Sequence, residues 1–258
     1  MNQPIIQHCS KGTISKKDIK LQFCESKERG IYFVLNNKTK FPANTDFLTS
    51  ATRNTVLGKD NDLICFVEHL LAAINLLKIN QIEIHVDGQE IPLIDGSAQP
   101  WIELLKNWPY KEAKIPPINL PEPIYIQADQ ERSIIAYPND EFKMTYLFES
   151  PVDQTKSWTS WTPDNGIEKL AKARTFGSVQ EHEMLGIKGQ WLSYDENGFD
   201  LPLYYPEEPA THKLLDLFGD LSLSGINPLS FKAHFISIKG GHSMNTKIAK
   251  QIKQIIGT

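Results

Sequence analysis

The sequence contains little cysteine. Only Cys9, Cys24 and Cys65 occur in 258 residues, and no two of them have CxxC spacing. An odd number of widely separated cysteines argues against both a disulfide framework and a zinc site built from thiolates. We therefore expect a protein with reduced thiols in the cytoplasm.

Long apolar runs and an excess of positive charge are also absent. No run of about 18 apolar residues occurs, which excludes a membrane-spanning helix. Residues 1–12 are polar and lack the apolar centre of a signal peptide. Lysine and arginine number 27 against 31 acidic residues, so no broad basic face for nucleic acid is expected. The GxxxxGK[ST], GxGxxG and GxSxG motifs are missing too, which removes support for nucleotide-binding folds and for a serine hydrolase.

Proline is concentrated in one segment. Residues 111–123 read KEAKIPPINLPEP and contain four of the 16 prolines. Proline has no backbone N–H and holds the chain extended, so this segment is predicted to be a linker. It separates two predicted domains of similar size, residues 1–110 and 124–258.

Both parts are predicted to contain strands and helices in a related order. The first has strand patterns at 18–24, 31–35 and 81–86, and helical patterns at 65–77 and 97–108. The second has strand patterns at 124–127, 133–137, 143–148 and 231–238, and helical patterns at 209–223 and 243–256. Residues 67–84 aligned on 214–231 share four identical positions. These features predict an α+β fold with two domains of like topology, each a β-sheet packed against α-helices.

Polar side chains recur at intervals of four on the helix predicted at 209–223. His212, Asp216 and Asp220 lie on one face of it, and a His and a carboxylate four residues apart can share a cation. A solvated helix face with a stabilising pair is the plainer interpretation. The repeat favours the metal site, because it aligns Asp216 with His69. If a pseudo-twofold axis relates the two domains, His69, His212 and Asp216 would form an open zinc site between them.

Two further residues have informative neighbours. Glu68 precedes His69 and could act as a general base on a zinc-activated water, although a surface glutamate in a first helical turn has the same pattern. His242 follows Gly240-Gly241 and precedes the last helix, which suits either close ligand approach or an ordinary helix start. Thr175 in ARTFG is uninformative by itself.

Five motifs together resemble the UDP-3-O-acyl-N-acetylglucosamine deacetylases of lipid A synthesis. They occur in the family's order, as VEHLLAA (67–73), VDGQEIPLIDGSAQPWIELL (86–105), ARTFG (173–177), HKLLDLFGDL (212–221) and KGGHSMNTKI (239–248). The resemblance implies two α+β domains with the active site between them. It also implies zinc-dependent hydrolysis of the N-acetyl group of a UDP-linked acylated amino sugar, which releases acetate.

The resemblance also implies a role for each matching residue. The implied zinc ligands are His69, His212 and Asp216. The implied catalytic residues are Glu68 as general base, His242 as cationic acid and oxyanion stabiliser, Asp220 as the partner of His242, and Thr175 as a hydroxyl at the amide carbonyl. The implied substrate contacts are Phe176, Lys213 and Leu57. We expect a monomer, and Fe²⁺ can replace Zn²⁺ at such a site in the cell.

Two segments depart from the family pattern. Residues 10–18 read SKGTISKKD in place of a glycine–leucine–histidine turn, and the segment 178–198 that follows ARTFG is short. In the family the latter segment builds the passage for the acyl chain. Deacetylation of another N-acetylated sugar therefore stays open as an alternative, as does a non-catalytic binding protein on the same scaffold.

Overall fold

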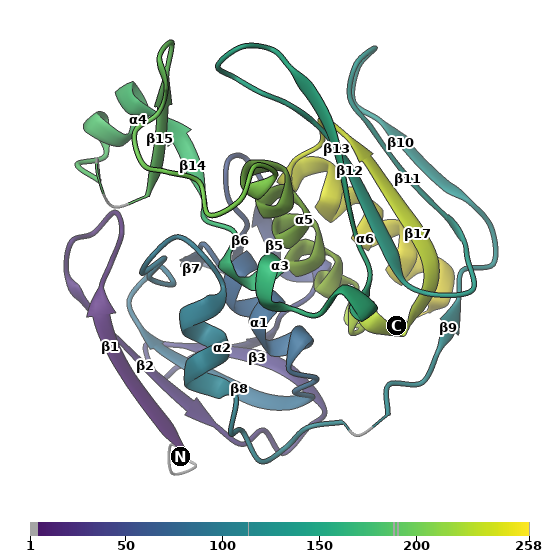
Figure 1. The fold of residues 1–258 in the computed structure, drawn as a ribbon. Helices are drawn as coiled ribbons and strands as arrows, with labels where there is room; N and C mark the ends of the chain where they lie inside the picture. The colour runs from purple at the N-terminus through teal and green to yellow at the C-terminus, as the bar shows by residue number, and fades with distance from the viewer. Residues whose placement is uncertain (1–4, 113, 188, 190, 258) are drawn as a thin grey trace.

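A computed structural model of the chain describes residues 5–112, 114–187, 189 and 191–257. Two large sheets form the outside of the molecule, and helices from both halves lie between them (Figure 1). None of the helices in these ranges is long and apolar enough to cross a membrane. Cys9 and Cys65 are free cysteines.

The first large sheet has the strand order β1-β2-β8-β3-β4. Its strands are β1 (Ile6–Lys11), β2 (Asp18–Cys24), β3 (Gly30–Leu35), β4 (Thr39–Pro42) and β8 (Gln81–Asp87). The central strand β8 runs antiparallel to β2 and parallel to β3. Strand β2 alternates buried and exposed residues, as its sequence pattern predicts for a sheet with one face on the core.

The second large sheet repeats this plan with the order β10-β11-β17-β12-β13. Its strands are β10 (Ile124–Gln127), β11 (Ser133–Pro138), β12 (Lys143–Glu149), β13 (Lys156–Trp161) and β17 (Phe231–Ile238), and β9 (Ile118–Asn119) pairs with β17. The central strand β17 runs antiparallel to β11 and parallel to β12, as β8 does with β2 and β3. The predicted α+β fold with two units of like topology is therefore confirmed.

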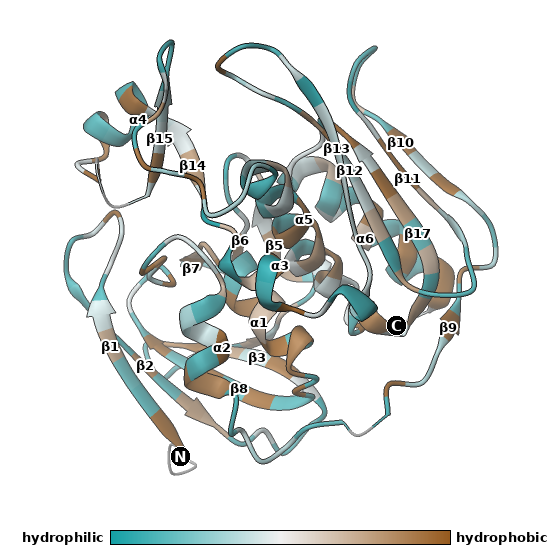
Figure 2. Ribbon diagram, in the orientation of Figure 1, coloured by the Kyte–Doolittle hydropathy of each residue, from teal (hydrophilic) through white to brown (hydrophobic). Residues whose placement is uncertain are grey.

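In the part of the chain that the structure describes, six α-helices accompany the sheets. They are α1 (Glu68–Leu76), α2 (Gln99–Leu105), α3 (Glu168–Lys172), α4 (Val179–Met184), α5 (Glu208–Leu221) and α6 (His242–Ile256). Helix α2 shows both hydrophilic and hydrophobic residues, as expected for a helix with one side on the core (Figure 2). One continuous hydrophobic core includes buried residues from both halves. The division into domains at 1–110 and 124–258 stays a prediction.

Each half also has a small sheet inserted ahead of its central helix. The insertions are β5 (Leu48–Ser50), β6 (Val56–Lys59) and β7 (Asp62–Cys65) before α1, and β14 (Phe176–Ser178), β15 (Leu192–Asp195) and β16 (Gly198–Phe199) before α5. Neither sheet was predicted from the sequence, because strands of two to four residues are too short to show alternation.

Helices α1 and α5 pack closely against each other at Gly219. A Cβ atom at this position would collide with the backbone carbonyl oxygen of Glu68. Backbone atoms cannot move aside as a flexible side chain can. We therefore expect Gly219→Ala to lower the free energy of unfolding by about 1–3 kcal/mol, as overpacking of a core does. Chemical denaturation measures this difference, and an unchanged midpoint and slope would contradict the close approach.

Candidate active site

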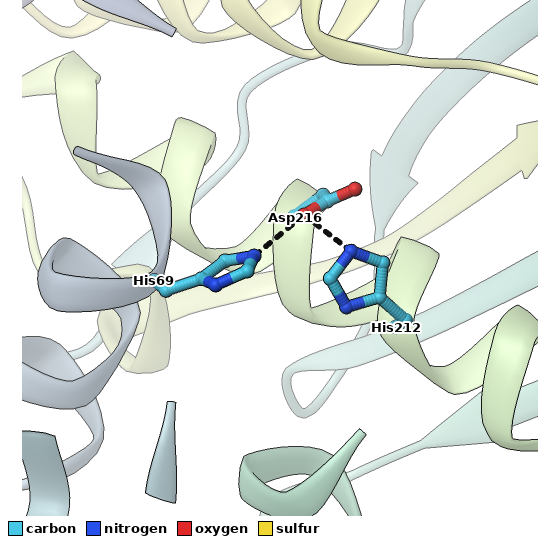
Figure 3. Close-up of side chains that lie close together, drawn as sticks. All are labelled: His69, His212 and Asp216. Atoms are coloured by element: carbon cyan, nitrogen blue, oxygen red, sulfur yellow. Dashed lines mark ion pairs between the residues drawn. The ribbon is translucent and has the colours of Figure 1, made fainter. Parts of the chain in front are cut away.

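Two histidines and an aspartate meet where α1 and α5 face each other. His69 comes from the first turn of α1, and His212 and Asp216 come from successive turns of α5 (Figure 3). The Nε2 atoms of His69 and His212 lie 3.4 and 3.3 Å from Oδ1 of Asp216. All three residues are almost completely buried. Their ligand atoms lie within 4.8 Å of one another, as a shared metal ion requires.

The donor set fits a divalent metal. Two imidazole nitrogens and one carboxylate oxygen are a ligand set of open, catalytic sites. Oδ1 of Asp216 is buried and has no hydrogen-bond partner among the described residues, so a cation would satisfy it. Burial lowers the pKa of His212 to about 3, so its imidazole is neutral and able to bind a metal.

Neighbouring groups fix the orientation of these ligands. Nδ1 of His212 donates to the carbonyl oxygen of Ala173 over 3.2 Å, which turns Nε2 toward Asp216. Lys213 Nζ donates to Oδ2 of Asp216 over 2.9 Å and leaves Oδ1 directed at the histidines. Burial alone would raise the pKa of Asp216, but the basic groups around it, with the Lys213 ammonium in direct contact, hold it well below its usual range. Asp216 is therefore an anion.

A second group of titratable side chains adjoins the cluster. Nε2 of His242 lies 3.9 Å from Oε1 of Glu68 and 3.8 Å from Oδ2 of Asp216, and Nδ1 of His242 lies 2.9 Å from Oδ2 of Asp220. Burial alone would lower the pKa of His242, but Asp220 and the other carboxylates raise it to about 9. Burial raises the pKa of Glu68, and the charge of His242 opposes that rise. The site thus places a cationic imidazole beside a buried carboxylate.

Comparison with known proteins identifies the family. The family model of the UDP-3-O-acyl N-acetylglycosamine deacetylases, LpxC, matches residues 3–254.

The chain belongs to this family.

Related LpxC proteins match over most of their length. The UDP-3-O-acyl-N-acetylglucosamine deacetylase of Synechocystis sp. is 35% identical over 243 residues, which are 87% of this chain and 87% of the relative. The deacetylase of the same name from Thermosynechococcus vestitus is 33% identical over 85% of this chain and 80% of its own length. The deacetylase of Chlamydia abortus is 29% identical over 94% of this chain and 88% of its own length. The resemblance found in the sequence motifs is confirmed.

The structure brings most of the residues with LpxC-implied roles together. The Phe176 ring packs edge-to-face on His212 with centroids 5.9 Å apart, and Lys213 Nζ lies 5.2 Å above the Phe176 ring. Thr175 precedes Phe176 and is half-buried, and its backbone N–H donates to Gly96. Leu57 is fully buried in the hydrophobic core, so its side chain has no exposed surface to offer a substrate. The individual roles stay predictions.

Sequence reasoning missed two residues at this site. Asn245 Nδ2 donates to Oδ2 of Asp220 over 3.0 Å, and it lies three residues after His242 on α6. His242 was predicted to precede this helix, and α6 begins one residue earlier than predicted, so the i,i+3 spacing of the pair was not visible in the prediction. Thr55 contacts both Glu68 and Asp220, but it comes from the loop before β6 and no local pattern marks it.

A buried ion pair secures the segment that orients His212. Arg174 Nε and Nη2 donate to Glu208 over 2.7 and 3.0 Å, and the guanidinium lies 3.8 Å from the centroid of the Tyr204 ring. Arg174 directly follows Ala173, whose carbonyl oxygen accepts from His212. The pair therefore ties this segment to the first turn of α5.

Removal of Arg174 is expected to destabilise the protein strongly. Arg174→Ala leaves the completely buried Glu208 carboxylate without its counter-charge, which costs about 3–5 kcal/mol of unfolding free energy. Lys172→Ala, which changes an exposed cation two residues earlier, is the matched control and should cost less than about 0.5 kcal/mol. Equal losses in the two variants, measured by denaturation, would refute the importance of the pair.

Proposed function

We propose that this chain hydrolyses the N-acetyl group of UDP-3-O-acyl-N-acetylglucosamine in lipid A synthesis. The observation that carries the proposal is the buried cluster of His69, His212 and Asp216 with Glu68 and His242 beside it, in a chain of this family. The products are acetate and the free amine of UDP-3-O-acyl-glucosamine. The reaction is an amide hydrolysis, so one water molecule is consumed.

We assign Zn²⁺ as the metal, held by His69, His212 and Asp216, with Fe²⁺ as the replacement that the same ligands accept. When bound, such an ion polarises a carbonyl oxygen and makes water a nucleophile near neutral pH. His69 and His212 supply neutral nitrogen ligands, and Asp216 supplies one negative charge. Lys213 balances part of that charge through its contact with the other carboxylate oxygen.

Glu68 and His242 move the protons. Glu68 accepts a proton at its carboxylate as the water oxygen bonds to the acetamide carbon. Protonated His242 stabilises the negative charge that develops on the carbonyl oxygen, and the hydroxyl of Thr175 assists it. When the C–N bond breaks, the amine nitrogen receives a proton from His242 or Glu68. Asp220 keeps His242 protonated through the bond to its Nδ1.

Aromatic side chains supply an apolar wall next to the metal cluster. The Phe176 ring has Tyr194 and Phe199 of its own small sheet at centroid distances of 6.4 and 6.3 Å, and His212 at 5.9 Å. This surface suits an acyl chain attached next to the reacting amide. Because the segment 178–198 is short, an N-acetylated sugar without the 3-O-acyl chain is the second candidate substrate. We place the enzyme in the cytoplasm, as a monomer.

Acetate release distinguishes the two candidate substrates. The zinc-loaded protein is given UDP-3-O-acyl-N-acetylglucosamine and, separately, UDP-N-acetylglucosamine, with the Glu68→Ala protein as control. We expect acetate from the acylated substrate at a much higher kcat/KM, and none from the control. Equal rates on both substrates would favour the alternative sugar. No acetate from either, although zinc is bound stoichiometrically, would refute the proposed function.

A further inference from the structure

Thr55 links Glu68 of the first half to Asp220 and His242 of the second half. It lies in the loop between β5 and β6 and is completely buried. Its backbone N–H donates to Oε2 of Glu68 over 3.1 Å, and its hydroxyl donates to Oδ1 of Asp220 over 2.5 Å. The same hydroxyl oxygen lies 3.4 Å from Nδ1 of His242. One residue of the first half therefore contacts the carboxylates of both halves.

Hydrogen bonds to both oxygens hold the Asp220 carboxylate in one orientation, and Thr55 supplies one of them. An ionised carboxylate only accepts hydrogen bonds. Oδ2 of Asp220 receives two, from Nδ1 of His242 over 2.9 Å and from Asn245 over 3.0 Å. Thr55 supplies the bond to Oδ1. With both oxygens occupied in a fully buried position, the plane of the carboxylate is fixed, and with it the direction of the His242 ring.

Glu68 is oriented by the same residue. The Thr55 N–H occupies Oε2, so the other oxygen, Oε1, is the one that faces Nε2 of His242 at 3.9 Å. Thr55 thus contacts both the general base and the partner of the acid. This loop comes from the small sheet β5-β6-β7, which the first half inserts ahead of α1.

We propose that Thr55 is a positioning residue, whose hydroxyl holds Asp220 and His242 in register with Glu68 across the two halves. This inference rests on the proposed function, in which Glu68 and His242 act on the same amide. Within the described residues, the hydrogen bonds of the Thr55 side chain reach Asp220 and His242 and none of the metal ligands. Its loss should therefore lower turnover and leave metal binding intact.

Thr55→Val removes the hydroxyl and preserves the shape of the side chain. Loss of a hydrogen bond to a buried charge lowers kcat by about 10- to 100-fold. We expect KM and zinc content to stay within about twofold of wild type. Thr55→Ser restores the hydroxyl and should recover most of kcat. Thr45→Val is the matched control, because Thr45 is also buried but its hydroxyl has no hydrogen-bond partner among the described residues.

Three outcomes would overturn the proposal. They are a Thr55→Val protein with wild-type kcat, a Thr55→Ser protein as impaired as Thr55→Val, and a folded Thr55→Val protein that has lost its zinc. Thr55→Ala replaces Thr55→Val if the latter fails to fold, and its kcat must fall at least as far.

A spectroscopic readout keeps this test separate from the proposed function. The Nδ1–H proton of His242 is followed by NMR at one pH and assigned by its absence from a His242→Asn protein. We expect its resonance to shift in Thr55→Val and to return in Thr55→Ser. An unchanged resonance in Thr55→Val would refute the positioning role even if the wild-type protein released no acetate. An inactive wild-type protein with the expected shift would refute the substrate assignment alone.

Discussion

Replacement of Asp216 by alanine is expected to abolish stoichiometric zinc binding, and turnover with it. Asp216 supplies the only carboxylate of the ligand set, and its Oδ1 lies 3.4 and 3.3 Å from the Nε2 atoms of His69 and His212. Loss of an outer partner of a metal ligand costs about 10- to 100-fold in affinity, and loss of a ligand should exceed that. Chelator competition followed by elemental analysis measures the affinity.

Asp220→Ala, one helical turn further along α5, is the control for this experiment. Asp220 bonds to His242, Asn245 and Thr55 and lies outside the cluster that could hold a metal. This variant should retain zinc and lose turnover, because His242 loses its anionic partner. Equal loss of metal from Asp216→Ala and Asp220→Ala would contradict the ligand assignment.

Glu68→Gln is expected to retain zinc and to lose turnover. Glutamine preserves an oxygen that accepts from the Thr55 N–H but cannot take a proton from water. A missing general base costs about 10²- to 10⁴-fold in rate. Steady-state acetate release and metal content together measure the effect.

Glu83→Gln is the matched control for Glu68→Gln. Glu83 is also a buried glutamate, but it lies on β8 and pairs with Lys40, away from the metal cluster. Its replacement should leave kcat within about twofold. If Glu68→Gln retained wild-type turnover, another residue would have to be the base.

Much of the fold could be predicted from periodicity. The helices predicted at 65–77, 209–223 and 243–256 correspond to α1, α5 and α6, with ends that differ by three residues or fewer. Their apolar faces are long enough to show a 3.6-residue period. The edge strand β13 was missed, because five of its six residues have partly or fully exposed side chains and no apolar alternation marks it.

The candidate site was predictable where two residues share a helix. His212 and Asp216 lie one turn apart on α5, and the internal repeat pointed to His69 opposite them. A solvated helix face was the wrong interpretation, since all three side chains are buried where α1 and α5 face each other. Neither Thr55 nor the Ala173 carbonyl oxygen could be found in this way. Their partners lie 165 and 39 residues away in the chain, and a backbone oxygen has no sequence signature.

The position of the bound metal tests the account most directly, because every assigned role refers to it. Diffraction data from zinc-loaded crystals, collected on either side of the zinc absorption edge, locate the ion without reference to activity. We predict a single anomalous peak at about 2.0–2.2 Å from His69, His212 and Asp216, with Glu68 and His242 outside the coordination sphere. A peak elsewhere in a protein that binds zinc stoichiometrically, or one in which Glu68 or His242 takes a ligand position, would contradict the account.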